Sequence, residues 1–334
     1  MRFASVPLFL VALGGCGSAH VGSGPADASN GGSSGGGTSD AAGTAGDATS
    51  TTESDDGGAN TTANDGAPSD GSPASDGAAM TLSDAAAHPC KRGMASNAAP
   101  THVFEPTGMA PGLSWWYDWA TKPPAGAANV EFVPMIWGAG SLNATIPAGS
   151  QYLLGFNEPN FSSQSDLTPA QAAADWPSVE AIAASQNLPI VSPAVNFCGG
   201  CSDPAITDPY TWLKDFFAAC TNCKVDYVAV HWYNCDLPSL EAYIEGNDAG
   251  LQGFVQFGKP IWLTEFSCDN SHPVADQRAY MQAAVPYLES NPHVMKYAWF
   301  SAGGIPNALL ADPDAGGALT ELGQTYVGLA QSCP

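Results

Sequence analysis

The chain has 334 residues, of which 44% are hydrophobic and 12% charged, and its 9 basic and 32 acidic side chains give a formal charge of -23 at pH 7. That charge argues against nucleic acid as a partner, because phosphate binding needs clustered Lys and Arg. The composition is uneven, since no aromatic residue lies between Phe9 and Phe104 and no Lys or Arg between Arg2 and Lys91. The first quarter therefore cannot build a hydrophobic core, and we expect the folded domain over residues 88–334.

Residues 1–16 predict an export signal. A basic start is followed by the short apolar run Phe3–Leu13, which is too short to span a bilayer as a mature helix. The run ends in Leu-Gly-Gly before Cys16, which resembles the bacterial lipobox, whose Cys is lipidated and becomes the mature N-terminus. We therefore expect a bacterial cell-envelope protein held at the outer surface of a membrane by lipid on Cys16. The alternative is an ordinary signal cut near Gly17, which discards Cys16 and releases a secreted protein.

Residues 17–87 predict a disordered tether. The segment consists largely of Gly, Ala, Ser, Thr and Asp, and its ten acidic residues lie between Asp27 and Asp84 without a basic partner. Low hydrophobicity with charge of one sign is typical of a chain that cannot offset its ordering entropy. We expect a flexible spacer between anchor and domain; a glycosylated stalk is the alternative.

Residues 88–334 contain eight short apolar runs bounded by Gly, Pro, Asn or Asp, as strands are. In chain order they are Arg92–Ser96, Ser114–Trp119, Val130–Trp137, Tyr152–Asn157, Ile190–Val195, Val225–Tyr233, Pro260–Phe266 and Val294–Phe300. Helical segments are expected from Pro169 toward Ser185, with Thr168 as N-cap, and over Pro209–Ala219 and Ala275–Ser290. Strands that alternate with helices eight times predict an α/β fold, a single (β/α)8 TIM barrel behind the disordered tether.

Eight cysteines lie in this domain: Cys90, Cys198, Cys201, Cys220, Cys223, Cys235, Cys268 and Cys333. An even number in an exported chain predicts disulfides. The two Cys-x2-Cys motifs also have the spacing of a zinc ribbon, so zinc is the alternative. The pairing stays open, because eight cysteines allow 105 connectivities; a Cys90–Cys333 bond would join the two ends of a closed barrel.

In such barrels the chemistry collects at the carboxyl ends of the strands. Glu158 directly follows the fourth run, and Glu265 lies near the end of the seventh. Strand alternation predicts that His231 and Tyr233 share one face, and that Ile261, Leu263 and Glu265 share another. We expect one mouth to gather the following residues: Asn157, Glu158, His231, Tyr233, Glu265, Trp137 and Trp299.

Two carboxylates beside aromatic rings indicate glycoside hydrolysis. One carboxylic acid protonates the departing sugar oxygen, and the other, ionised, attacks the anomeric carbon. Trp rings can pack on the apolar C–H faces of sugars. Trp116 and Trp137 are candidate sugar platforms or core residues, and His231 is either a site residue or a core histidine. Asn157 alternatively closes an Asx turn.

Four motifs at the strand ends resemble a known family. Leu154-Gly155-Phe156-Asn157-Glu158-Pro159, His231-Trp232-Tyr233, Trp262-Leu263-Thr264-Glu265-Phe266 and Tyr297-Ala298-Trp299-Phe300 are similar to the alkali-sensitive linkage protein-like glycosyl hydrolase core, within glycoside hydrolase family 128. The resemblance implies a retaining barrel with Glu158 as acid/base and Glu265 as nucleophile. It also implies that Asn157 binds the substrate 2-hydroxyl, Tyr233 orients the nucleophile and Trp299 floors the cleavage subsite.

The sequence therefore predicts a retaining glycoside hydrolase that cleaves β-glucan by double displacement, as an endo-β-1,3-glucanase. The expected partner is the polysaccharide; we expect no cofactor, no metal and a monomer. The alternative is a surface lipoprotein that kept the glycan cleft and lost catalysis. Retention of both Glu158 and Glu265 argues against it, because a binder needs no proton donor opposite a nucleophile.

Overall fold

The computed structural model describes residues 90–96, 112–124, 130–303, 305–311 and 318–331. The predicted signal, the lipid-bearing Cys16 and the tether lie outside these residues, as does Cys333. Those predictions, and the Cys90–Cys333 pairing, stay predictions. Within the described ranges, no helix is long and apolar enough to cross a membrane.

Eight short strands fall inside the eight predicted runs. They are β1 (Arg92–Ala95), β2 (Trp115–Tyr117), β3 (Glu131–Phe132), β4 (Leu153–Leu154), β5 (Ile190–Val191), β6 (Val228–Trp232), β7 (Ile261–Phe266) and β8 (Val294–Phe300). Six form a parallel sheet in the order β3-β2-β1-β8-β7-β6, and β4 pairs with β5, also in parallel. Single parallel bridges, Met135–Leu154 and Val191–Tyr227, join the β4–β5 pair to chain segments beside β3 and β6. The predicted α/β class with parallel strands is confirmed.

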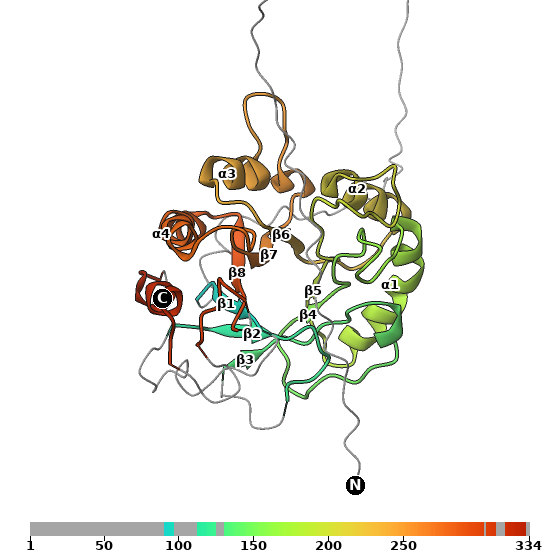
Figure 1. The fold of residues 1–334 in the computed structure, drawn as a ribbon. Coiled ribbons are helices and arrows are strands. Elements are labelled where there is room, and N and C mark those ends of the chain that lie inside the picture. The colour runs from blue at the N-terminus through green and yellow to red at the C-terminus, as the bar shows by residue number, and fades with distance from the viewer. Residues whose placement is uncertain (1–89, 97–111, 125–129, 304, 312–317, 332–334) are drawn as a thin grey trace, which may run out of the picture. The chain divides into compact units, whose positions relative to one another are not determined.

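The helices lie around these strands (Figure 1). Helix α1 (Pro169–Ala184) begins at a capping box in which Thr168 and Gln171 bond each other's backbone N–H. Helices α2 (Pro209–Ala219) and α4 (Val274–Ser290) also match the prediction. Helices α3 (Leu237–Glu245) and α5 (Glu321–Gly328), and the 3-10 turns η3 (Ala139–Ser141) and η4 (Phe254–Phe257), were not predicted.

Strand alternation divides the core into two clusters. A helix-facing cluster packs strand residues such as Val230 and Tyr297 against α1, α2 and α4. A strand-face cluster, which includes Trp115, Tyr117 and Trp262, fills the other side of the strands. The polar groups of the candidate site lie at the carboxyl ends of these strands, next to the strand-face cluster.

A buried cation, the Lys296 ammonium, lies against the strand-face cluster near the amino ends of the strands. The Lys296 ammonium lies 5.6 Å from the ring centroid of Trp115, 5.4 Å from that of Tyr152 and 5.5 Å from that of Trp262. Burial lowers the Lys296 pKa, and the nearby Glu131 carboxylate, at 3.6 Å, opposes that shift. Side chains therefore fill this end of the strand-face cluster.

A β-bulge changes the predicted face of Glu265. Val230 pairs with Leu263 but His231 pairs with Glu265, so Thr264 is an extra residue on β7. Ile261 and Leu263 therefore pack in the helix-facing cluster, whereas Glu265 turns to the other face. The prediction that these three residues share a face was wrong, because the bulge breaks the period of two.

The cysteines form disulfides within the described ranges. Cys198 bonds Cys201, Cys220 bonds Cys223, and Cys235 bonds Cys268. Each Cys-x2-Cys motif therefore closes on itself, and the four sulfurs do not gather around a zinc ion. The disulfide prediction is confirmed for these six residues.

Candidate active site

Glu158 lies on a strained turn in the segment that follows β4. Its φ is +39°, which is uncommon for a residue with a side chain and is held only where the surroundings enforce it. The preceding strand approaches its neighbour closely, because a Cβ on Gly155 would lie 2.9 Å from both the Ser192 carbonyl carbon and the Val191 oxygen. The Glu158 side chain on this turn is 11% exposed.

Glu265 is held by one donor on β2 and by two donors in the segments that follow β2 and β6. Its Oε1 accepts from the Tyr117 hydroxyl at 3.0 Å and from the Trp119 indole at 2.8 Å. Its Oε2 accepts from the Tyr233 hydroxyl. Hydrogen bonds to an ionised carboxylate are stronger than neutral ones and fix its orientation. The carboxylate is therefore anchored through both oxygens.

His231 joins the two carboxylates. Its Nδ1 lies 2.9 Å from Oε1 of Glu158 and 3.3 Å from Oε2 of Glu265, and the ring is fully buried. One ligand atom from each of the three residues lies within 4.8 Å of the others. His231 and Tyr233 share a face, as predicted, and the site role of His231 is favoured over the core histidine.

The charges of this cluster perturb one another. Burial raises the pKa of Glu265, the nearby Glu158 raises it further, and His231, Tyr233 and Trp119 oppose the shift. For His231, burial alone would lower the pKa, but the two carboxylates more than compensate and the pKa is raised. A protonated imidazole between two acids stabilises whichever of them is ionised.

The structure buries two tryptophans that were candidates for the site: this corrects the place expected for Trp299 and favours the core alternative for Trp116. Trp299 is fully buried in the helix-facing cluster, where its indole donates to the Asn307 carbonyl at 2.8 Å. Trp116 is also fully buried there and donates to the Val130 carbonyl at 3.3 Å. Neither ring can receive a sugar, because alternation points both toward the helices.

Their immediate strand neighbours take the place expected for these rings. Phe300, next to Trp299, packs edge-on against Trp119 at 5.8 Å and against Tyr233 at 5.6 Å. Tyr117, next to Trp116, bonds Glu265 directly. We did not predict Tyr117, Trp119 or Phe300, although Trp115, Tyr117 and Trp119 follow a period of two that could have revealed the first two.

Asn157 and Trp137 lie together beside Glu158. The Asn157 amide donates to Gln164 at 3.3 Å, and its Oδ1 is buried without a hydrogen-bond partner among the described residues. No hydrogen bond of the amide closes an Asx turn on its own backbone. Trp137 is half-buried, and its carbonyl accepts from the Asn157 N–H at 2.9 Å. The free Oδ1 acceptor suits a substrate hydroxyl.

The residue types also allow a metal ion. Glu158, His231 and Glu265 are the one group among the described residues whose ligand atoms gather closely enough to hold one. However, the His231 Nδ1 that faces the acids already bonds Glu158. The hydrogen-bonded triad accounts for the arrangement.

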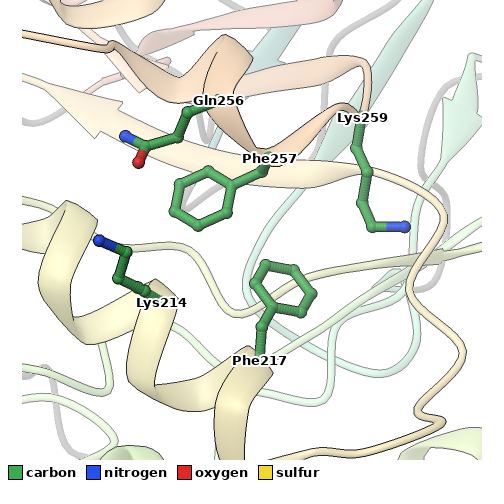
Figure 2. A pocket seen from close by; sticks show the side chains of 5 residues that line it. All are labelled: Lys214, Phe217, Gln256, Phe257 and Lys259. Atoms are coloured by element: carbon green, nitrogen blue, oxygen red, sulfur yellow. The ribbon is translucent and has the colours of Figure 1, made fainter. Parts of the chain in front are cut away.

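A separate hollow of about 320 Å³ lies between α2 and η4 (Figure 2). The Phe217 and Phe257 rings line it between Lys214 and Lys259. Lys259 precedes β7, whereas Glu265 lies near the carboxyl end of that strand. The hollow is therefore at the opposite end of β7 from the carboxylates and is not part of the candidate site.

Comparisons with known proteins agree with this geometry. Residues 93–326 match the family model described as glycosyl hydrolase catalytic core. Alkali-sensitive linkage protein 1 of Schizosaccharomyces pombe is 31% identical over 257 residues, which are 71% of this chain but 44% of that protein, so the chain spans less than half of that relative.

Solved structures are similar as well. An endo-beta-1,3-glucanase of GH128 subgroup II from Sorangium cellulosum is 40% identical, with a TM-score of 0.63 over 73% of this chain and 100% of that one. Its counterpart from Pseudomonas viridiflava is 34% identical, with a TM-score of 0.57 over 72% and 98% of the two chains.

Proposed function

Because the chain belongs to the glycosyl hydrolase catalytic core family, we propose that it is a retaining endo-β-1,3-glucanase with Glu158 as acid/base and Glu265 as nucleophile. The observation that carries the proposal is the closeness of the two carboxylates, whose nearest oxygens lie within 4.8 Å. Retaining glycosidases keep their carboxyl groups about 5–5.5 Å apart, whereas inverting ones leave about 6.5–9.5 Å for a water molecule.

The reaction proceeds in two displacements. Glu265 forms a bond to the anomeric carbon as the glycosidic bond breaks, and Glu158 gives its proton to the departing sugar oxygen. Glu158, now ionised, takes a proton from water, whose oxygen attacks the anomeric carbon and releases Glu265. The β-configuration is therefore inverted twice and retained.

The surrounding residues keep each acid in its role. Tyr117, Trp119 and Tyr233 donate to Glu265 and favour its ionised form against the effect of burial. His231 is a positioning residue, since its Nδ1 lies within reach of both acids and sets their separation. Asn157, which directly precedes Glu158 and whose buried Oδ1 has no partner among the described residues, binds the 2-hydroxyl of the sugar.

The substrate is a neutral β-glucan. An acidic protein of charge -23 suits an uncharged polysaccharide better than a polyanion. The two GH128 relatives described as endo-beta-1,3-glucanases, at 34–40% identity, support the β-1,3 linkage.

The proposal includes a closed (β/α)8 barrel. Its support is the succession of eight parallel strands, in which single bridges continue the parallel order from β3 to β4 and from β5 to β6. In a closed barrel the carboxyl ends of β4 and β7 open onto the same mouth, which suits two acids that act on one bond.

The proposal also places the enzyme at a bacterial cell envelope. Lipid on Cys16 anchors it, residues 17–87 act as the tether, and the domain works as a monomer, or the protein is secreted when the signal is cut after Cys16. The lipobox-like run before Cys16 and the one-sided charge of the tether support this. Radiolabelled palmitate incorporation that Cys16→Ser abolishes is the test.

The function itself is tested by product analysis of the full-length protein on linear β-1,3-glucan beside β-1,4- and β-1,6-linked glucans. We expect oligosaccharides from the β-1,3 polymer, lost in Glu158→Gln and in Glu265→Gln. Cleavage of another polymer, lost in both variants, would move the linkage but keep the mechanism. Binding without cleavage would favour the catalytically inactive glycan-binding lipoprotein.

A further inference from the structure

The chain after β5 is fastened to the chain that carries the acid/base. Segment 196–202 follows β5, and segment 158–162 follows β4. Their hydrogen bonds run from the Asn160 amide to the Asn196 carbonyl at 2.6 Å, from the Ser202 N–H to the Asn160 carbonyl at 2.9 Å, and from the Ser162 N–H to the Gly200 carbonyl at 3.0 Å. Whatever segment 196–202 presents is therefore held at a fixed place beside Glu158.

The side chain that it presents is Phe197. With 44% of its surface exposed, Phe197 is the most exposed large hydrophobic residue among the described ones. Its ring centroid lies 5.7 Å from that of Tyr243 and 6.2 Å from that of Tyr210, so two other rings pack against it. An aromatic ring that is already ordered loses little entropy when a flat apolar surface packs on it.

A disulfide braces the segment directly after this ring. Cys198 bonds Cys201, and Cys201 pairs with Phe161 in an antiparallel bridge to the Glu158 segment. Asn196 is buried, and its Oδ1 accepts from the Phe197 N–H at 2.8 Å. The backbone on both sides of Phe197 is therefore tied down.

The position of the Phe197 segment indicates which side of the cleaved bond its ring would contact. The acid/base must face the oxygen of the departing sugar, and the nucleophile must face the anomeric carbon. Strand β5 lies beside β4, the strand that leads into Glu158, whereas Glu265 lies on β7. The segment that carries Phe197 is thus bonded to the segment that carries the acid/base, on the side of the cleft where the departing sugar lies.

We propose that Phe197 is the stacking platform for a glucosyl unit on the leaving-group side of the cleaved bond, and this rests on the proposed function. The ligand is a β-linked glucan whose apolar C–H face covers the exposed ring. The platform favours long substrates, because only they place a sugar there.

The experiment compares two substrates of the full-length enzyme. Linear β-1,3-glucan occupies the leaving-group side with sugars, whereas β-laminaribiosyl fluoride has only fluoride there. We expect Phe197→Ala to lower kcat/KM on the polymer about tenfold and to leave kcat/KM on the fluoride unchanged, while Phe197→Trp retains activity on both. Leu251→Ala removes another exposed apolar side chain, 38% exposed, and should change neither value.

The outcomes separate the two levels of the proposal. The platform role is contradicted if Phe197→Ala leaves kcat/KM on the polymer unchanged, or if it lowers kcat/KM equally on both substrates. The glucanase function would stand in either case. If Phe197→Ala does not fold, Phe197→Leu, which keeps the apolar volume but removes the flat ring, gives the same comparison. Wild-type protein that cleaves neither substrate overturns the proposed function and the platform with it.

Discussion

The indole Nε1 of Trp119 donates a hydrogen bond of 2.8 Å to Oε1 of Glu265, which joins the chain after β2 to β7. Trp119 has a φ of +59°, so its backbone is held in a conformation that side chains rarely adopt. Its ring packs against Tyr117 at 5.3 Å and Phe300 at 5.8 Å. This strained residue therefore fixes one oxygen of the proposed nucleophile.

Replacing Trp119 by Phe keeps an aromatic ring and removes the donor. The hydrogen bond lowers the pKa of Glu265, so its loss lets burial raise that pKa further. Because Glu265 must be ionised to attack, the acid limb of the kcat/KM profile should move to higher pH, by about one unit for a hydrogen bond to a charged group. The control is Trp137→Phe, which changes a tryptophan that makes no hydrogen bond to Glu265. The acid limb of its kcat/KM profile should stay in place. If the acid limb of Trp119→Phe stays in place or moves to lower pH, the Trp119 hydrogen bond does not hold down the pKa of Glu265.

His231 links the site to stability. Its folded-state pKa is raised, so the protonated ring contributes stability that is fully present below its ordinary value of 6.5 and is lost as pH rises through the raised value. His231→Asn should therefore lower Tm most at about pH 5 and progressively less toward alkaline pH. Thermal melts of both proteins across this range measure the gap, and a gap that widens with pH would be the opposite of this expectation.

Burial of the Asp118 carboxylate disfavours its ionised form and costs stability, and replacing the carboxylate by a neutral amide should remove this cost. Burial raises its pKa to about 6 from 3.8, while the N–H groups of Ala120 and of Asp118 itself oppose the shift. Stability therefore falls as pH rises from about 4 to 6, and the full penalty applies above 6. Asp118→Asn retains an acceptor for Ala120, so Tm at pH 7.5 should rise by a few degrees. The gain should shrink at pH 4; an equal gain at both pH values would exclude ionisation as the cause.

The two Cys-x2-Cys disulfides provide a matched comparison. Cys198–Cys201 braces the segment bonded to the Glu158 turn, whereas Cys220–Cys223 follows the end of α2. Each closes a loop of the same length, so replacing either pair by Ser should lower Tm by a similar small amount. Only the Cys198→Ser, Cys201→Ser protein should lose kcat/KM on β-1,3-glucan, about tenfold, because misplacing the acid/base slows proton transfer. Equal activity of the two double variants would show that the brace does not position Glu158.

The sequence predicted the elements better than the orientation of single side chains. All eight strands and the Thr168 cap of α1 were predicted, because apolar runs and the signal Thr168-Pro169 are local. The Asp208 cap of α2 was not predicted, although the helix itself was. The bulge at Thr264 has no local signal and turned Glu265 to the other face.

The aromatic residues show the same limit. Trp299 was placed under the substrate by the family resemblance, and Trp116 was a candidate platform or core residue. The phase of β8 and β2 instead points both rings toward the helices, and Phe300 and Tyr117 lie on the other face. Helix α3 was missed, although Asp236 caps it as Asp208 caps α2. That Glu158 and Glu265 lie close together was predictable because both follow or end a strand-like run, while their hydrogen-bond partners depend on strand register.

The most direct test of the central claim is to trap the glycosyl-enzyme with 2-deoxy-2-fluoro-β-laminaribiosyl fluoride and map the label by mass spectrometry. We expect one labelled peptide, with the sugar ester on Glu265. Glu158→Gln should still be labelled, because fluoride leaves without a proton. A label on another residue, or no label together with products of inverted configuration, would contradict the assignment of Glu265 as nucleophile.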